Sequence, residues 1–278
     1  MPPSAMRSRC RPGSWLLRLL SSEFAGQVVF EGVVPAGPVR PVGHEPCVEV
    51  GEGLSLQTGT VNRMNSSGQK VRVHCATVSL DGFLAGPNQS LERPMGEHFD
   101  GMHDWMIATR TGAAIVGAEG GATGVDEDFV ARSFEGVGAY ILGRHVFGPS
   151  RGPWTDDGWT GWWGPNPVYH SPTFVLTHHP RPSIPMEGGT TFHFATDGIH
   201  DTLDRAFAAA DGGDVRVVGG AATLHEFLRE GLVDEMHLVF VPALVGEGER
   251  LFAGPIPYRC ERTVPSGNVL HALFSRIP

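Results

Sequence analysis

Two adjacent glycines between a buried strand and a helix form the segment of this sequence best suited to bind an anion. Valines over residues 215–218 predict a short strand, Gly219 and Gly220 a turn, and the apolar spacing that follows a helix ending at Gly231. Because glycine lacks a Cβ atom, its backbone can approach a ligand at a helix start, where partial positive charge collects. Phosphate suits such a turn. Taken alone, the pair is explained better by a tight turn that requires a positive φ.

Polar side chains follow two other predicted strands. One strand ends in Gly143 and is followed by Arg144 and His145, and another ends in Thr177 and His178. A guanidinium suits phosphate because its N–H fork matches two phosphate oxygens at once. The alternative for Arg144 is a salt bridge on the surface.

A scaffold in which strands alternate with helices must position these side chains. Such alternation predicts an α/β fold with a mostly parallel central sheet flanked by helices, which binds ligands at the carboxyl ends of its strands. The last two strands are expected to form an antiparallel C-terminal edge. Strands are predicted at residues 71–77, 139–143, 173–177, 191–196, 215–218, 236–241, 258–264 and 269–277, and helices at residues 99–107, 126–135, 199–210 and 221–230.

Composition and charge argue against several classes of function. The 278 residues, 41% hydrophobic and 18% charged, are typical of a soluble globular protein with one or two domains. A net charge of −9 disfavours nucleic acid or an anionic membrane as the main partner, because either needs a positive patch. No apolar run reaches bilayer length. Scattered cysteines at positions 10, 47, 75 and 260 indicate reduced thiols and a cytoplasmic protein.

Motifs for other chemistries are missing from the sequence. It contains no GxSxG elbow of a hydrolase, no GxxxxGK[ST] phosphate loop and no HExxH zinc motif. Its 13 histidines lack the spacing of metal ligands, so we expect no metal site.

Residues 1–69 differ from the rest of the chain. They contain no aspartate and no tyrosine, and several prolines and many glycines interrupt them. We expect a weakly ordered N-terminal extension, or a segment upstream of a true start at Met64. An apolar run at residues 15–20 has some features of a secretory signal but is short and interrupted by Arg18. The functional domain is therefore predicted at residues 70–278.

Six motifs in this order resemble the dihydrofolate reductase-like family, which includes the C-terminal reductase domain of bifunctional riboflavin-biosynthesis deaminase-reductases. The resemblance covers residues 70–278 and implies a dihydrofolate reductase-like fold, NADPH as cofactor and a homodimer. The motifs are VSLDGFLAG at residues 78–86, YILGRH at 140–145, FVLTH at 174–178, VGGA at 218–221, GLVDEMHL at 231–238 and VPALVGEGERLF at 241–252.

The resemblance also implies roles for individual residues. Arg144 would contact the 2′-phosphate of NADPH, His145 would lie near the diphosphate, and Thr177 and His178 would lie beside the adenosine. The glycine pair then becomes one wall of a three-sided dinucleotide cleft. The other cofactor-binding residues implied are Thr77 and Leu84 at the nicotinamide, Gly143 at the strand end, and Val218, Gly219, Gly220, Ala221, Ala222 and Thr223 at the diphosphate.

The catalytic acid is where the sequence departs from this family. Dihydrofolate reductases carry a helix carboxylate, for which this chain offers Asp104 in an ambiguous register, and a late-strand threonine, which Val239 replaces. Asp81 is the other candidate catalytic residue. The alternatives are a solvated helix residue for Asp104 and a turn cap for Asp81. A dihydrofolate substrate is therefore expected less than another heterocycle or a carbonyl compound.

The expected function is hydride transfer from NADPH to a small heterocycle of the pteridine or ribosylaminopyrimidine type. In such a reaction the protein positions donor and acceptor in a dry pocket. A catalytically inactive dinucleotide-binding sensor or partner-binding module is the alternative. The tryptophan-rich loop at residues 153–165 is expected to serve as a mobile lid or a dimer contact.

Overall fold

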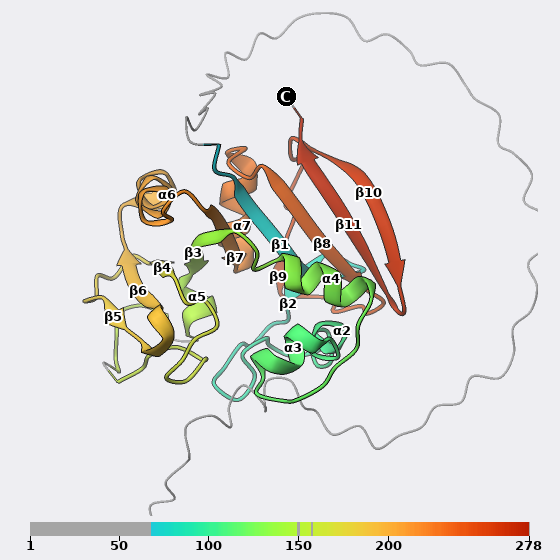
Figure 1. Ribbon diagram of the computed structural model, residues 1–278, viewed down its shortest axis with the longest axis horizontal. Helices are drawn as coiled ribbons and strands as arrows, with labels where there is room; N and C mark the ends of the chain where they lie inside the picture. Colours follow the sequence, from blue (N-terminus) through green and yellow to red (C-terminus); the bar gives the residue numbers. More distant parts are fainter. Residues whose placement is uncertain (1–67, 149–150, 157, 278) are drawn as a thin grey trace, which may run out of the picture. The chain divides into compact units, whose positions relative to one another are not determined.

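A nine-stranded sheet forms the centre of the computed structural model, which describes residues 68–148, 151–156 and 158–277 (Figure 1). Its strand order is β10-β11-β8-β1-β7-β3-β4-β6-β5, and β2 pairs separately with β9. The strands are β1 (Val71–Ser79), β2 (Phe83–Ala85), β3 (Val137–Gly143), β4 (Pro172–Leu176), β5 (Ile184–Pro185), β6 (Thr191–Ala195), β7 (Asp214–Gly219), β8 (Glu235–Val241), β9 (Glu249–Arg250), β10 (Tyr258–Ser266) and β11 (Val269–Arg276).

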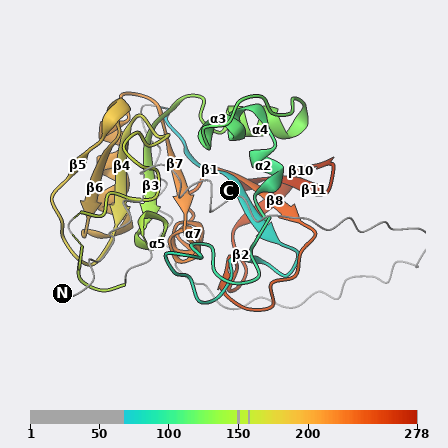
Figure 2. The ribbon, with the colours of Figure 1, turned by 90° about the horizontal axis from the view of Figure 1, so that it is seen from below.

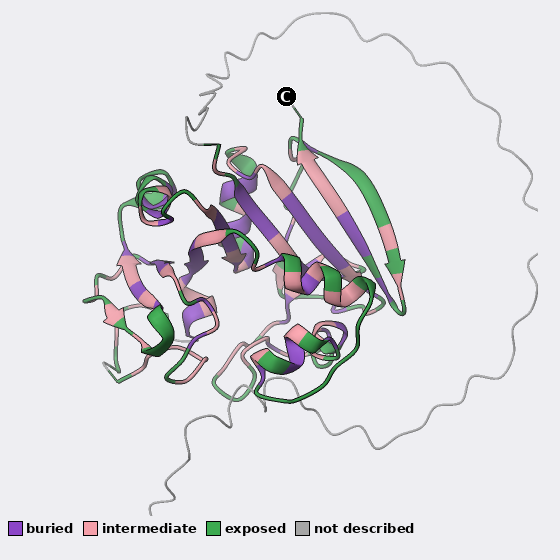
Figure 3. Ribbon diagram, viewed as in Figure 1, coloured by how far each residue is buried: buried purple, intermediate pink, exposed green. Residues whose placement is uncertain are grey.

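Six adjacent strands, from β8 to β6 in the sheet order, run parallel to one another. Strand β11 joins β8 antiparallel, β10 joins β11 antiparallel, and β5 joins β6 antiparallel at the opposite edge. Figure 3 shows β1 and β8 largely buried, while β10 is mostly exposed at its edge. The predicted α/β fold with a mostly parallel sheet and an antiparallel C-terminal edge is confirmed.

One face of the sheet packs against α6 (Gly198–Ala209) and α7 (Ala221–Arg229). Side chains alternate along each strand, so Met236 and Leu238 of β8 join this core while Val239 points to the other face. This alternation lets parallel strands bury both faces.

The opposite face has two separate covers. Over β1 and β8 lie α2 (Asp104–Ile107), α3 (Arg110–Ile115) and α4 (Val125–Arg132), on the side away from α7 (Figure 2). Over β3, β4 and β6 lie α5 (Arg144–Phe147) and the aromatic loop, by which we mean residues 151–156 and 158–163. The only other short helix of the described residues is a 3-10 turn, η1 (Glu187–Gly189).

Element bounds differ from the prediction in the region between β2 and α4. The helix expected at residues 99–107 shortens to α2, because Gly101 adopts a positive φ of 72° that interrupts an α-helix. The sequence pattern did not predict α3, α5, β2, β5, β9 or η1, which span two to six residues each. Elements this short contain too few residues to show the hydrophobic periodicity by which helices and strands are recognised in a sequence.

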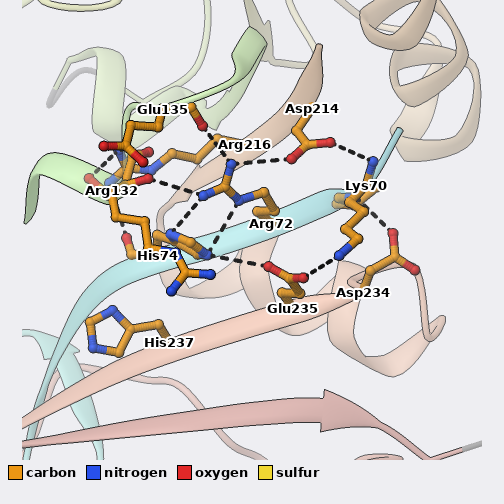
Figure 4. A network of polar contacts seen from close by, with 12 residues as sticks. Lys70, Arg72, His74, Arg132, Glu135, Asp214, Arg216, Asp234, Glu235 and His237 are labelled. Atoms are coloured by element: carbon orange, nitrogen blue, oxygen red, sulfur yellow. Dashed lines mark hydrogen bonds and ion pairs between the residues drawn. The ribbon is translucent and has the colours of Figure 1, made fainter. Parts of the chain in front are cut away.

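A buried network of charged and polar groups joins the amino ends of β1 and β7 to the segment after α4 (Figure 4). Arg72 donates from NH1 to the Glu135 carbonyl at 2.8 Å and to Asp214 Oδ2 at 3.2 Å. Arg216 donates to the Ser133 carbonyl at 2.9 Å and to the His74 carbonyl at 3.0 Å. This network fixes the end of the sheet opposite the strand ends that carry the predicted site.

The extension predicted at residues 1–69 and the start predicted at Met64 lie outside the described residues, apart from residues 68 and 69. Within the described part of the chain, no helix combines the length and apolar character needed to cross a bilayer.

Candidate functional site

A cleft of about 680 Å³ opens where the carboxyl ends of β3, β4 and β6 meet the start of α7. Its size is in the range of small-molecule sites, and most of its lining is apolar. The lining from these ends consists of Gly143, Arg144, His145, Val146, Leu176, Thr177, His178, His179, Ala195, Thr196, Gly198, Ile199, Gly220, Ala221, Ala222, Thr223 and Glu226. The other lining residues are Leu84, Ala85, Gln89, Pro94, Met95, Arg151, Gly152, Trp162, Trp163 and Glu249.

The start of α7 forms one wall of this cleft. Gly220 is the N-cap, and the peptide bond between Gly219 and Gly220 is cis. The N–H groups of the first helical turn have no partner within a helix, so those at residues 221–223 are available to a ligand. Backbone donors and the helix dipole therefore favour an anion at this wall.

Close packing between the end of β3 and α7 explains why glycine stands at position 143. A Cβ atom there would lie 2.5 Å from Thr223 Oγ1 and 3.4 Å from the Gly220 nitrogen. The absence of a side chain lets the two walls of the cleft approach each other.

Arg144 begins α5 directly after Gly143, and its guanidinium lies flat against the Trp154 ring, with Cζ 3.2 Å from the ring centroid. Its Nε, NH1 and NH2 atoms are shielded from water and have no hydrogen-bond partner among the described residues. Burial, and secondly the nearby Arg181, lowers the pKa of Arg144 to about 10. The group therefore stays charged at neutral pH. The surface salt bridge considered for Arg144 does not occur among the described residues.

The turn after β4 supplies the third wall. Thr177 Oγ1 accepts a hydrogen bond from the His179 N–H at 3.1 Å, which holds His178 at the lining of the cleft. His145 of α5 also lines the cleft, and its pKa is lowered first by burial and then by the charge of Arg151. Both histidines thus lie beside the predicted cofactor cleft.

Three of the predicted cofactor residues lie behind the cleft surface. Thr77 is buried and its Oγ1 accepts a hydrogen bond from Trp105 Nε1 at 3.1 Å. Val218 and Gly219 end β7 beneath the lining residue Gly220. Leu84, the other residue predicted at the nicotinamide, does line the cleft.

Asp81 lies in the turn between β1 and β2 and is not among the lining residues. Its carboxylate accepts hydrogen bonds from Ser79 Oγ at 2.6 Å, from the Val245 N–H at 3.1 Å and from the Gly246 N–H at 2.7 Å. The bond from Ser79 is the main cause that lowers the pKa of Asp81 to about 2. Its contacts are those of a turn cap, and its predicted catalytic role stays a prediction.

Asp104 opens α2 and lines a different, smaller hollow formed by residues 92–96 and 99–104. The residue is exposed, although partial burial of the carboxylate raises its pKa. Because it does not line the large cleft, the structure does not bring it together with Arg144 and the α7 start. Met102, two residues before Asp104, is buried in the core.

Carboxylates that the sequence did not single out do line the cleft. Glu226 comes from α7 and Glu249 from β9, where an ion pair of 3.6 Å joins Glu249 to Arg151. Glu249 belongs to the motif at residues 241–252, but that motif alone does not reveal that β9 pairs with β2 and so lies beside Leu84.

The aromatic loop packs inward against the sheet. Trp154 and Trp159 donate hydrogen bonds to the carbonyls of His179 and Phe147 at 2.9 and 3.0 Å. Trp163 stacks on Phe192 with ring centroids 5.6 Å apart. Trp154, Trp159 and Trp163 belong to a hydrophobic cluster on the sheet, and Trp162 and Trp163 line the cleft, so the loop is a wall of the cleft in this structure.

No described group of three or more His, Cys, Asp or Glu side chains has an arrangement that could hold a metal ion. The cleft therefore offers an organic ligand backbone donors, one unpaired cation and apolar walls.

Comparison with known proteins gives the following similarities. Residues 70–270 match the sequence profile of a family described as the RibD C-terminal domain. No curated protein matches the chain. A putative riboflavin biosynthesis protein from Shewanella sp. PV-4 is 20% identical with a TM-score of 0.48, and the alignment covers 76% of this chain and 100% of that one.

Two further solved structures are similar. RibD from Acinetobacter baumannii is 18% identical with a TM-score of 0.44, over 80% of this chain and 61% of that one. Dihydrofolate reductase from Enterococcus faecalis, complexed with NADP(H) and RAB-propyl, is 13% identical with a TM-score of 0.42, over 76% of this chain and 97% of that one.

Proposed function

Since this chain belongs to the RibD C-terminal domain family, we propose that it is an NADPH-dependent reductase. The proposed reaction is hydride transfer to a small heterocycle of the pteridine or ribosylaminopyrimidine type, as in riboflavin or folate metabolism. The observation that supports it most is the buried, unpaired guanidinium of Arg144 in a cleft that also contains a helix N-terminus.

The described residues fit the anionic groups of NADPH. Burying a cation without a hydrogen-bond partner is costly, and a phosphate at Arg144 would offset that cost. The free N–H groups at residues 221–223 suit a diphosphate, because they present several donors and a partial positive charge. The two sites lie on adjoining walls, since Gly143 touches Thr223 and precedes Arg144.

The far side of the cleft suits a flat, weakly polar ring. Its lining is apolar at Leu84, Ala85, Pro94 and Met95, with Gln89 and Glu249 as polar groups. When bound, NADPH supplies the hydride, and the protein has to hold the acceptor against it and keep water away. The apolar side chains exclude water, and Gln89, whose Nε2 donates to the Pro94 carbonyl at 2.9 Å, has an amide oxygen that can accept a hydrogen bond from a ring.

Reduction of a C=N or C=O group also requires a proton at the heteroatom. We place the donor at Glu249, because Glu226 and Glu249 are the carboxylates among the lining residues that the structure describes, and Glu249 adjoins the strand that carries Leu84. Asp81 and Asp104 lie outside this lining. A residue within hydrogen-bond reach of the reacting group is the first requirement of general acid catalysis.

A dinucleotide-binding sensor without turnover remains the second candidate. It is favoured by the position of Asp81 and Asp104, which are not among the lining residues of the cleft that contains Arg144 and the start of α7. A homodimer is also proposed, from the resemblance alone.

One experiment separates these functions. The purified full chain is mixed with NADPH and a panel of pterins, ribosylaminopyrimidines and simple carbonyl compounds, and absorbance at the reduced nicotinamide band is followed. Oxidation with at least one compound supports the reductase. Binding of NADPH, seen as tryptophan quenching, without oxidation across the panel supports the sensor, and no binding of NADPH contradicts both.

A further inference from the structure

Trp154 of the aromatic loop lies in direct contact with the cation of the cleft. The guanidinium carbon of Arg144 is 3.2 Å from the centroid of its ring. The indole itself is fixed, because Nε1 donates to the His179 carbonyl at 2.9 Å and its ring packs edge-on against Phe194 with centroids 5.0 Å apart.

The Trp154 side chain connects the segment after β3, through Arg144, with the segment after β4, through His179. His179 belongs to the turn after β4 that Thr177 Oγ1 closes at 3.1 Å, whereas Arg144 follows β3. The position of the guanidinium relative to the β4 turn is therefore set by the indole between them.

Stacking and phosphate binding use different parts of a guanidinium. The ring occupies one face, whereas the N–H bonds lie in the plane and point outward from its edges. All three nitrogens are shielded from water and lack partners among the described residues. A phosphate that binds these nitrogens has to displace the atoms that now shield the edges, while Trp154 continues to cover the stacked face.

A second cation strengthens the attraction for an anion at this place. Arg181 Cζ lies 4.9 Å from the same Trp154 ring, and its NH1 donates to the Trp159 carbonyl at 2.8 Å. Its charge also contributes to the lowered pKa of Arg144. Two guanidinium groups held around one indole favour a group that carries more than one negative charge.

We propose that Trp154 is a positioning residue for cofactor selectivity, which holds the Arg144 guanidinium with its donor edges ready for the 2′-phosphate of NADPH. This inference rests on the proposed function, since it assumes that NADPH binds in the cleft. It assigns to one residue of the aromatic loop a role in specificity, exerted through Arg144 and without contact to the reacting atoms.

The test measures the dissociation constants of NADPH and NADH by isothermal titration calorimetry for the full chain and its variants. Trp154→Leu removes the aromatic face and should reduce the preference for NADPH about three- to tenfold, as expected for loss of a cation–π contact. Trp154→Phe keeps an aromatic face and should retain the preference. Trp159→Leu is the matched control from the same loop. If Trp154→Leu does not fold, as judged by circular dichroism, Trp154→Met takes its place.

A double-mutant cycle separates positioning from general damage. In an Arg144→Ala background, Trp154→Leu should cause no further loss of preference. A loss of equal size in that background would overturn the proposal, and so would an unchanged preference in Trp154→Leu when Arg144→Ala alone lowers it. In both cases the proposed function stands. Absence of NADPH binding by the unmodified chain would instead contradict the proposed function itself.

Discussion

The guanidinium of Arg144 carries the proposed preference for NADPH. Its three nitrogens are buried and unpaired among the described residues, so a phosphate that binds there gains charge-assisted hydrogen bonds at a group already removed from water. The resemblance to the reductase family implied this role for Arg144, and the match between a guanidinium and phosphate agreed with it. The sequence could not predict the stacking on Trp154, ten residues further along the chain.

Replacing Arg144 by alanine should weaken NADPH binding about 10- to 100-fold, the range expected for lost hydrogen bonds to a charged group. NADH binding should change little, because NADH lacks the 2′-phosphate. Calorimetric titration of both cofactors measures the effect, with Arg259→Ala on the exposed strand β10 as a control. Equal losses for both cofactors would exclude Arg144 from selecting between them.

Replacing Glu249, the proposed proton donor, should reduce turnover without weakening the binding of the cofactor. Glu249→Gln replaces the carboxyl group by an amide, which cannot take up and pass on a proton, while keeping the shape of the side chain, so kcat should fall about 100-fold, a typical contribution of general acid catalysis. Tryptophan quenching by NADPH should be retained. Glu226→Gln, in the same cleft, is the matched control. A kcat unchanged in Glu249→Gln would show that the proton comes from elsewhere.

At the scale of elements, the site depends on the contact between the end of β3 and the start of α7. The sequence predicted both elements and the glycines at their ends, because each is long enough to show its apolar period. The short helices α3 and α5 were not predicted, and the loop at residues 153–165 was predicted without its inward packing. The inward packing of Trp154 and Trp163 depends on Phe194 and Phe192 of β6, which a local pattern cannot reveal.

Gly143→Ala tests the close approach of β3 and α7. The new Cβ atom would lie 2.5 Å from Thr223 Oγ1, so the walls must separate, and both the melting temperature and the affinity for NADPH should fall. Adding Thr223→Ala removes the clashing oxygen and should restore part of both. Gly254→Ala is the control, because its Cβ would meet no atom within 4 Å. A Gly143→Ala protein with unchanged melting temperature would show that the walls are not in contact.

A second packing contact between elements, on the face under α4, should make stability depend on pH. His237 of β8 accepts or donates a 3.0 Å hydrogen bond with His271 of β11, and Phe129 of α4 stacks on both rings. Burial, and then the neighbouring His271, lowers the pKa of His237 to about 3. In the unfolded chain His237 takes up a proton near pH 6.5, whereas in the folded chain it stays neutral until the pH approaches 3.

The free energy of unfolding should accordingly decrease as the pH falls from about 6.5 towards 3, by up to about 1.4 kcal/mol per pH unit for this group. Urea unfolding at pH 7.5 and 5.0 measures the change. Between pH 7.5 and 5.0, the free energy of unfolding should decrease less in His237→Gln than in the unmodified protein. This holds even if the variant is already less stable at pH 7.5. An equal or larger decrease in the variant would show that His237 is not its source.

At the scale of the whole molecule, the cleft joins the ends of three strands, β3, β4 and β6, to the start of α7. Alternation of strands and helices predicted that these ends share one edge of a parallel sheet. It did not predict the strand order, which places β7 between β1 and β3 and so brings α7 next to Arg144. The homodimer expected from the resemblance stays a prediction.

The proposed function requires selective binding of NADPH in this cleft. Calorimetric titration of the full chain with NADPH and NADH under identical conditions is the most direct test. We predict saturable binding of one NADPH per chain, tighter than that of NADH, with the difference lost in Arg144→Ala. Equal affinity for the two cofactors, or no binding of either, would contradict the proposed NADPH-dependent function.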